Sequence, residues 1–130
     1  MFSRSPKRRK APKMGVRQSS VIECRGHRQW VAGHYCCIAG RVAKEGPMAG
    51  EVHVCEGRID PHHVKTRGAG GGDEQVAPLC RRAHNQLDSP GWSQPLFERA
   101  YSVDLAEVAA DLWRKSKHRI TYERKQEKEG

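Results

Sequence analysis

The sequence predicts a small α+β domain preceded by a basic arm. Three observations lead to this expectation: the length of 130 residues, a weak period-two strand pattern at 51–60 and an amphipathic helix near the C-terminus. A chain of this length can fill one compact core of about eighty to a hundred residues. No segment is apolar enough over enough residues to span a bilayer, so no membrane partner is expected.

Positive charge is concentrated at the start of the chain. The whole sequence has 24 Lys and Arg against 15 Asp and Glu, a formal charge of +9. Residues 1–20 contain seven basic residues and no acid, and Lys7, Arg8, Arg9 and Lys10 form their densest run. We expect a disordered arm that binds phosphates, with nucleic acid as the commonest polyanion. An acidic membrane surface as the partner, or a merely solvated tail, are the alternatives.

The first half of the globular part alternates between short elements and turns. ECRGHRQWVAGHYCC, at 23–37, suits a short helix that leads into a turn. Glycine and proline interrupt residues 38–50, which we expect to be a loop or hairpin. EVHVCEGRID, at 51–60, is the predicted strand, and GAGGG, at 68–72, predicts a flexible connection.

Two helices are predicted in the second half. The first begins near Pro78, because proline is tolerated in a first turn, and carries His84 and Asp88 on one face. The second runs from about Asp104 to Lys117 and has an apolar stripe: Leu105, Val108, Ala109, Leu112 and Trp113. The mixed-charge tail after it is expected to fray.

Two adjacent histidines, His62 and His63, follow the predicted strand. A strand directs neighbouring side chains to opposite faces. One imidazole can therefore bind a metal together with His84, while the other acts on a substrate. A divalent ion beside a free imidazole suits phosphodiester cleavage, because the base activates water and the cation stabilises the developing charge.

Three stretches together resemble a known family: CRGHRQWVAGHYCCIAG, DPHHVKTRGAGGGDEQVAPLCRRAH and FERAYSVDLAEVAADLW. The chain resembles HNH endonucleases of the ββα-metal class, in particular the small phage and prophage type related to the recombination enhancement function nuclease. The resemblance implies a ββα-metal core with flanking helices. The parts would be a basic arm at 1–20, a nuclease domain at 21–100, a supporting helix at 101–120 and a flexible tail at 121–130.

The resemblance also implies residue roles. His62 and His84 would bind one divalent metal ion (Mg, Mn, Ni or Zn), and His63 would be the general base. Asp88 falls where the class often has another histidine, so it is a third candidate ligand; a helix-end carboxylate without a ligand role is the alternative. Two basic residues beside the pair are expected to contact phosphates: Lys65 and Arg67.

The chain departs from the family pattern at the asparagine that gives the family its middle letter. Gln75 stands in about that place, and Asp73 lies nearby. Either can make the hydrogen bond that orients His63. A badly oriented base is a poor base, so this departure bears directly on catalysis.

A second departure concerns cysteines. Relatives commonly carry two Cys-x-x-Cys pairs that bind a structural zinc, but Ala39 and Ala83 replace the partners of Cys36 and Cys80. Two thiolates do not complete a tetrahedral site, so no structural four-cysteine zinc is expected. The alternative is a site rebuilt from other residues: Cys37, Cys55 or a nearby histidine.

The expected function is metal-dependent cleavage of DNA in a phage or prophage setting, with DNA as partner and a recombination or phage protein as a second one. Five cysteines without a secretory pattern favour a cytoplasmic protein. The glycine run lacks the ending of a phosphate-binding loop, so no nucleotide cofactor is expected. We assign no catalytic part to the other histidines: His27, His34, His53 and His118. The alternatives are a catalytically inactive nucleic-acid-binding protein of the same fold and a Cys/His zinc-binding adaptor.

Overall fold

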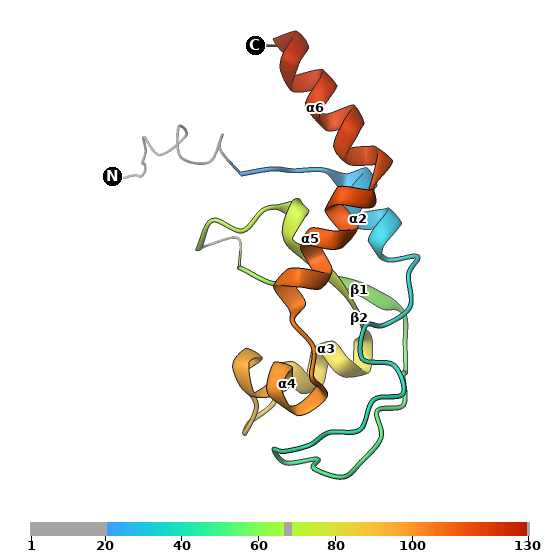
Figure 1. The fold of residues 1–130 in the computed structure, drawn as a ribbon, viewed down its shortest axis with the longest axis vertical. Helices are drawn as coiled ribbons and strands as arrows, with labels where there is room; N and C mark the ends of the chain where they lie inside the picture. Colours follow the sequence, from blue (N-terminus) through green and yellow to red (C-terminus); the bar gives the residue numbers. More distant parts are fainter. Residues whose placement is uncertain (1–20, 67–68, 130) are drawn as a thin grey trace, which may run out of the picture.

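A computed structural model describes residues 21–66 and 69–129 of the chain (Figure 1). The prediction of an α+β protein is confirmed, because the described residues form five α-helices and one two-stranded antiparallel sheet. Our expectations for the N-terminal arm, with Arg8, Arg9 and Lys10, and for Arg67 lie outside these residues. The elements are α2 (Arg25–Val31), β1 (Ile59–His63), the 3₁₀ turn η3 (Asp73–Gln75), β2 (Val76–Cys80), α3 (Arg81–Leu87), α4 (Gln94–Tyr101), α5 (Leu105–Lys115) and α6 (Lys117–Glu129).

The sheet lies at the centre of the molecule, between α2 and α5 on one side and α3 and α4 on the other (Figure 1). Strand β1 runs antiparallel to β2, with Ile59 opposite Cys80 and His63 opposite Val76. All five residues of β2 are buried, whereas those of β1 are half-buried. The sheet therefore has one strand in the core and one that carries functional groups to the surface.

The boundary between β2 and α3 differs from our expectation. We predicted a helix from near Pro78, but residues 76–80 are extended and the helix begins at Arg81. Cys80 has extended dihedral angles, φ −65° and ψ 162°, and its sulfur accepts the N–H of Ala83 at 3.3 Å. Burial of the whole segment favours the ladder with β1, and the cap at Cys80 fixes where the helix starts.

The strand predicted at 51–60 is also displaced. In the structure the strand begins at Ile59, and residues 51–58 are irregular apart from a bridge between Val42 and Val52. Val52 and Val54, which suggested the alternation, are exposed. The alternating pattern at this place therefore does not reflect one buried face.

Helix α5 is the element that the sequence predicts best. It begins one residue after Asp104, whose Oδ1 accepts the N–H of Glu107 at 3.1 Å, and it ends at Lys115. Leu105 and Ala109 of its apolar stripe are buried against the sheet and η3. Helix α5 therefore covers β2 and the 3₁₀ turn η3, which directly precedes that strand.

Two helices were not predicted. Helix α4 follows a turn-rich stretch, is capped by Ser93 and buries Phe97 and Tyr101 in the core. Helix α6 forms where we expected a frayed tail, and it extends away from the rest of the molecule (Figure 1). The start of α6 lies against α2: Oγ of Ser116, the residue before α6, lies 3.0 Å from Nδ1 of the buried His27. None of the helices in the described residues has the length and apolar content to cross a membrane.

Candidate metal and catalytic centre

His62 and His84 lie side by side, as the predicted metal pair would. Their ring centroids are 5.2 Å apart, with the planes inclined at 66°. His62 Nε2 lies 3.2 Å from Oε1 of Gln94 and donates its proton to that oxygen. Burial lowers the pKa of His62, which favours the neutral imidazole. Neutral imidazole is the form that binds metals.

The carboxylate of Asp60 forms a hydrogen bond with the ring of His84. Nδ1 of His84 donates to Oδ2 of Asp60 at 3.2 Å, so the proton sits on Nδ1 and the Nε2 lone pair is left for a ligand. Asp60 also lies 3.3 Å from Nε of Arg81. We did not single out Asp60 or Gln94 from the sequence. Asp60 stands two residues before His62 on β1, and this same-face spacing was the available signal.

Asp88 does not complete this pair. It is the C-cap residue of α3 and is exposed. In the described part of the chain, the donor atoms of His62, His84 and Asp88 do not all lie within 4.8 Å of one another. The Asp88 charge still opposes the lowering of the His62 pKa, so the carboxylate faces the same region. The structure thus brings together two of the three predicted ligands.

His63 points to the other side of β1, against η3. Its Nε2 lies 2.9 Å from Oδ1 of Asp73, a fully buried carboxylate. The other oxygen, Oδ2, accepts the N–H of Cys24 at 2.7 Å and lies 3.0 Å from Nε of Arg28. Asp73 is therefore fixed from two directions and in turn fixes the His63 ring. The histidine keeps 23% of its side chain exposed.

Gln75, the other candidate for orienting His63, has a different environment. Its backbone oxygen accepts the N–H of Val64 at 2.9 Å, which extends the ladder beyond His63. Its Oε1 is buried and has no hydrogen-bond partner among residues 21–66 and 69–129. Gln75 and Lys65 line a cavity of about 460 Å³ beneath α5, next to Trp113. Of the two candidates, the structure places Asp73 against the imidazole.

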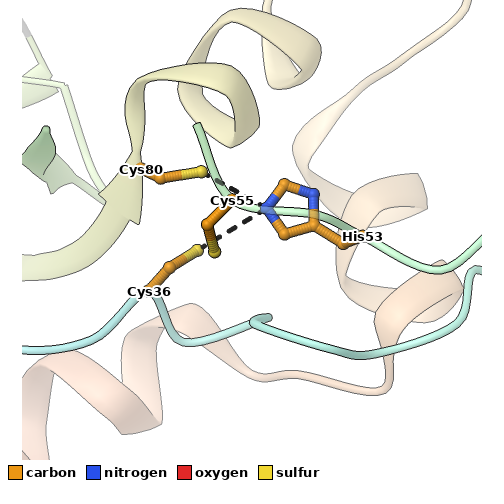
Figure 2. A group of neighbouring side chains, drawn as sticks. All are labelled: Cys36, His53, Cys55 and Cys80. Atoms are coloured by element: carbon orange, nitrogen blue, oxygen red, sulfur yellow. Dashed lines mark hydrogen bonds between the residues drawn. The ribbon is translucent and has the colours of Figure 1, made fainter. Parts of the chain in front are cut away.

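A second cluster joins three cysteines and one histidine: Cys36, His53, Cys55 and Cys80 (Figure 2). Their donor atoms all lie within 4.8 Å of one another. His53 Nε2 is 3.3 Å from Sγ of Cys80 and 4.0 Å from Sγ of Cys36. Zinc bonds of about 2.3 Å to sulfur and 2.0–2.1 Å to nitrogen give tetrahedral edges of about 3.5–3.8 Å. The distances to His53 bracket this range, so the donor set fits zinc.

Our expectation that no structural zinc site exists is therefore wrong. The cysteine partners are replaced by Ala39 and Ala83, but His53 and Cys55 complete the set from the segment between α2 and β1 (Figure 2). A rebuilt site was the alternative that the sequence left open. The His-x-Cys spacing at 53–55 was the signal, and we had given His53 no role.

The pKa values of the thiols in this cluster are shifted in different directions. Burial raises the pKa of Cys36. Burial also acts to raise the pKa of Cys80, but hydrogen bonds from backbone N–H groups, first that of Ala83, outweigh it and lower this pKa. Cys80 is thus the thiol of this cluster best prepared to be a thiolate, and a divalent cation held by the cluster would supply the charge that deprotonates the others.

Comparison with protein-family models, with curated proteins and with solved structures finds no match to this chain. Function must therefore be inferred from the residues and their geometry. Two histidine–carboxylate contacts on opposite sides of β1 and a Cys/His cluster at the end of β2 are the features that carry chemistry.

Proposed function

We propose that this protein is a metal-dependent DNA endonuclease that hydrolyses phosphodiester bonds by a one-metal HNH mechanism. The observation that carries the proposal is that the adjacent residues His62 and His63 have different contacts. The first meets His84, whose ring is held by Asp60, and the second meets Asp73. One of two adjacent residues on the strand thus belongs to a metal-binding pair, and the other is an oriented base.

The order of elements supports this proposal. Two antiparallel strands, β1 and β2, lead directly into α3, which carries His84. This order is what the resemblance to the ββα-metal class implies. The formal charge of +9 provides the electrostatic attraction that a polyanionic substrate requires.

In this mechanism His63 takes a proton from water. Asp73 accepts the Nε2 proton and holds the ring, so Nδ1 is the nitrogen that acts as base. His62 and His84 would hold one divalent ion (Mg, Mn, Ni or Zn), with Asp88 as a further candidate. When bound, that ion stabilises charge on the phosphoryl group and on the leaving oxygen.

The Cys/His cluster would have a structural role in the same protein. It joins the segment after α2, the irregular segment at 53–55 and the end of β2. Cys80 directly precedes α3, so a zinc ion there would fix the helix on which His84 stands. Zinc in this cluster would be separate from the ion used in catalysis.

Plasmid nicking tests the proposal. Wild type and His63→Ala would be assayed in parallel with Mg²⁺, Mn²⁺, Ni²⁺ and Zn²⁺, after zinc content and DNA binding have been shown to be equal. We expect nicking only by wild type. Equal nicking by both proteins would refute the role of His63.

A second candidate is a catalytically inactive nucleic-acid-binding protein with the same fold. The position of Asp88 favours it, because this exposed carboxylate does not join His62 and His84. The same assay separates the two candidates. Tight DNA binding by both proteins without nicking in any metal would favour the inactive protein.

A further inference from the structure

A cavity of about 320 Å³ lies between α2 and the start of β1. Three arginines line it: Arg25 and Arg28 from α2, and Arg58 from the residue before β1. Asp60 is the acid among its lining residues. The cavity therefore brings three arginine side chains to one concave surface, and guanidinium groups are well suited to bind phosphate.

Two acids close to these arginines, Asp60 and Asp73, are already engaged. Asp60 lies 3.7 Å from Nε of Arg58, and it also accepts the Nδ1 proton of His84. Asp73 lies 3.0 Å from Nε of Arg28, which leaves the terminal N–H groups of that guanidinium for another partner. Arg25 is exposed and makes no ion pair within residues 21–66 and 69–129. Positive charge thus remains available to a ligand.

The cavity is connected to both halves of the proposed catalytic centre. Asp73 contacts Arg28 through one oxygen and His63 through the other. Asp60 likewise contacts both Arg58 and His84. An anion in this cavity would therefore lie one side chain away from the base and one side chain away from the metal pair.

We propose that this cavity binds a backbone phosphate of DNA that neighbours the cleaved one. The occupant is inferred from charge complementarity and from the shared carboxylates, and its identity as DNA rests on the proposed function. Arg25 and Arg58 contact this phosphate directly, and Arg28 contacts it while Asp73 holds the guanidinium in place. The contact anchors the DNA backbone beside β1, the strand that carries His62 and His63.

Salt-dependent DNA binding by the full chain tests this proposal. Arg25→Ala, Arg58→Ala and the double variant would be made in the His63→Ala protein, and duplex binding would be measured by fluorescence anisotropy without added divalent ion. Each lost phosphate contact should reduce the slope of log K against log [salt] by about 0.9. The double variant should therefore lose about 1.8. The N-terminal arm is the same in every variant, so its contribution cancels.

Arg99→Ala is the matched control, because Arg99 is 61% exposed and pairs with Glu45, away from this cavity. Zinc content and thermal melting establish that each variant is folded. A double variant whose slope equals that of Arg99→Ala would overturn the phosphate site. A slope that falls for duplex RNA and not for duplex DNA would overturn DNA as its occupant.

Nicking by the proteins with His63 intact separates this inference from the proposed function. A reduced slope together with no nicking in any metal would overturn the endonuclease alone and would support the phosphate cavity. Nicking by wild type together with an unchanged slope in the double variant would overturn the cavity alone.

Discussion

Loss of one cysteine of the Cys/His cluster should remove zinc from the protein and lower its melting temperature. The sharpest comparison is between Cys36→Ala and Cys37→Ala, because the two cysteines are adjacent. Cys36 belongs to the cluster with His53, whereas Cys37 lies outside it and packs partly buried against the core. Each substitution removes one sulfur atom, and the buried Cys36 loses more packing than the half-buried Cys37.

The size of the effect follows from linkage between binding and folding. Three of the four donors are buried: Cys36 is 5% exposed, His53 5% and Cys80 0%. Such a site forms only in the folded chain, so zinc binding stabilises the native state. Free zinc at one hundred times its dissociation constant contributes about 2.7 kcal/mol. At about 4–8 °C per kcal/mol for a domain of 60–100 residues and about 2–4 °C for one of 150–250 residues, the melting temperature of this chain should fall by about 5–20 °C on zinc loss.

Metal analysis and thermal melting provide the measurement. Wild type and Cys37→Ala should contain zinc close to one ion per chain, and Cys36→Ala should contain almost none. A strong chelator should lower the melting temperature of the first two proteins and leave the third unchanged. Cys37→Ala alone should cost roughly 1 kcal/mol through lost packing.

The reasoning would be refuted by either of two results. One is wild-type protein that carries no zinc after purification and reconstitution. The other is equal melting of Cys36→Ala and Cys37→Ala with no response to chelation. In either case the four side chains would be a packed cluster of thiols and an imidazole.

Three further predictions concern catalysis, backbone and pH. Asp73→Asn should slow nicking by about 10²–10⁴-fold with zinc content retained, because the single amide oxygen cannot accept both from His63 and from the N–H of Cys24; an unchanged rate would contradict this. Gly57→Ala should cost about 1–3 kcal/mol in urea unfolding, because its φ is +82° and a Cβ would lie 2.7 Å from a side-chain carbon of α3. Gly40→Ala, at φ +73° in open space, should cost less, and equal costs would argue against the contact. Burial lowers the pKa of His27 from 6.5 to about 4, so stability present above pH 6.5 should fall by at most about 3 kcal/mol as the pH drops towards 4. His27→Leu should remove this part of the pH dependence, and an unaltered profile in that variant would contradict the assignment.

The sequence predicted those features of the fold that depend on residues close together in the chain. The stripe of α5 and its cap at Asp104 depend on neighbours three and four residues away, so the sequence indicates both. The opposite directions of His62 and His63 follow from the pleat of any strand. The contact between His62 and His84 also depends on where the helix places His84. The strand pattern does not predict this, and only the resemblance implied it.

Contacts between distant segments account for what was missed. VAPLCRRAHNQLD suggests one helix, because proline is common in a first turn, yet its first five residues are fully buried and pair with β1. Burial against the core is a tertiary effect that helix propensity does not contain. The Cys/His cluster brings together donors from positions 36, 53, 55 and 80, and a search for Cys-x-x-Cys pairs does not detect that spacing.

The two sites are connected through the register of the sheet. Cys80 ends β2 opposite Ile59, and three pairs further along the ladder His62 stands opposite Ala77. A slip of one residue would turn every side chain of β1 to the other face and would exchange the positions of His62 and His63. The residue before β1 is also held near Cys80, because the backbone N–H of Arg81 donates to the backbone oxygen of Arg58 at 2.8 Å. A zinc ion bound by Cys80 would therefore act on the proposed catalysis from about 10 Å along the strand, by fixing that His62 lies beside His84 and that His63 lies against Asp73.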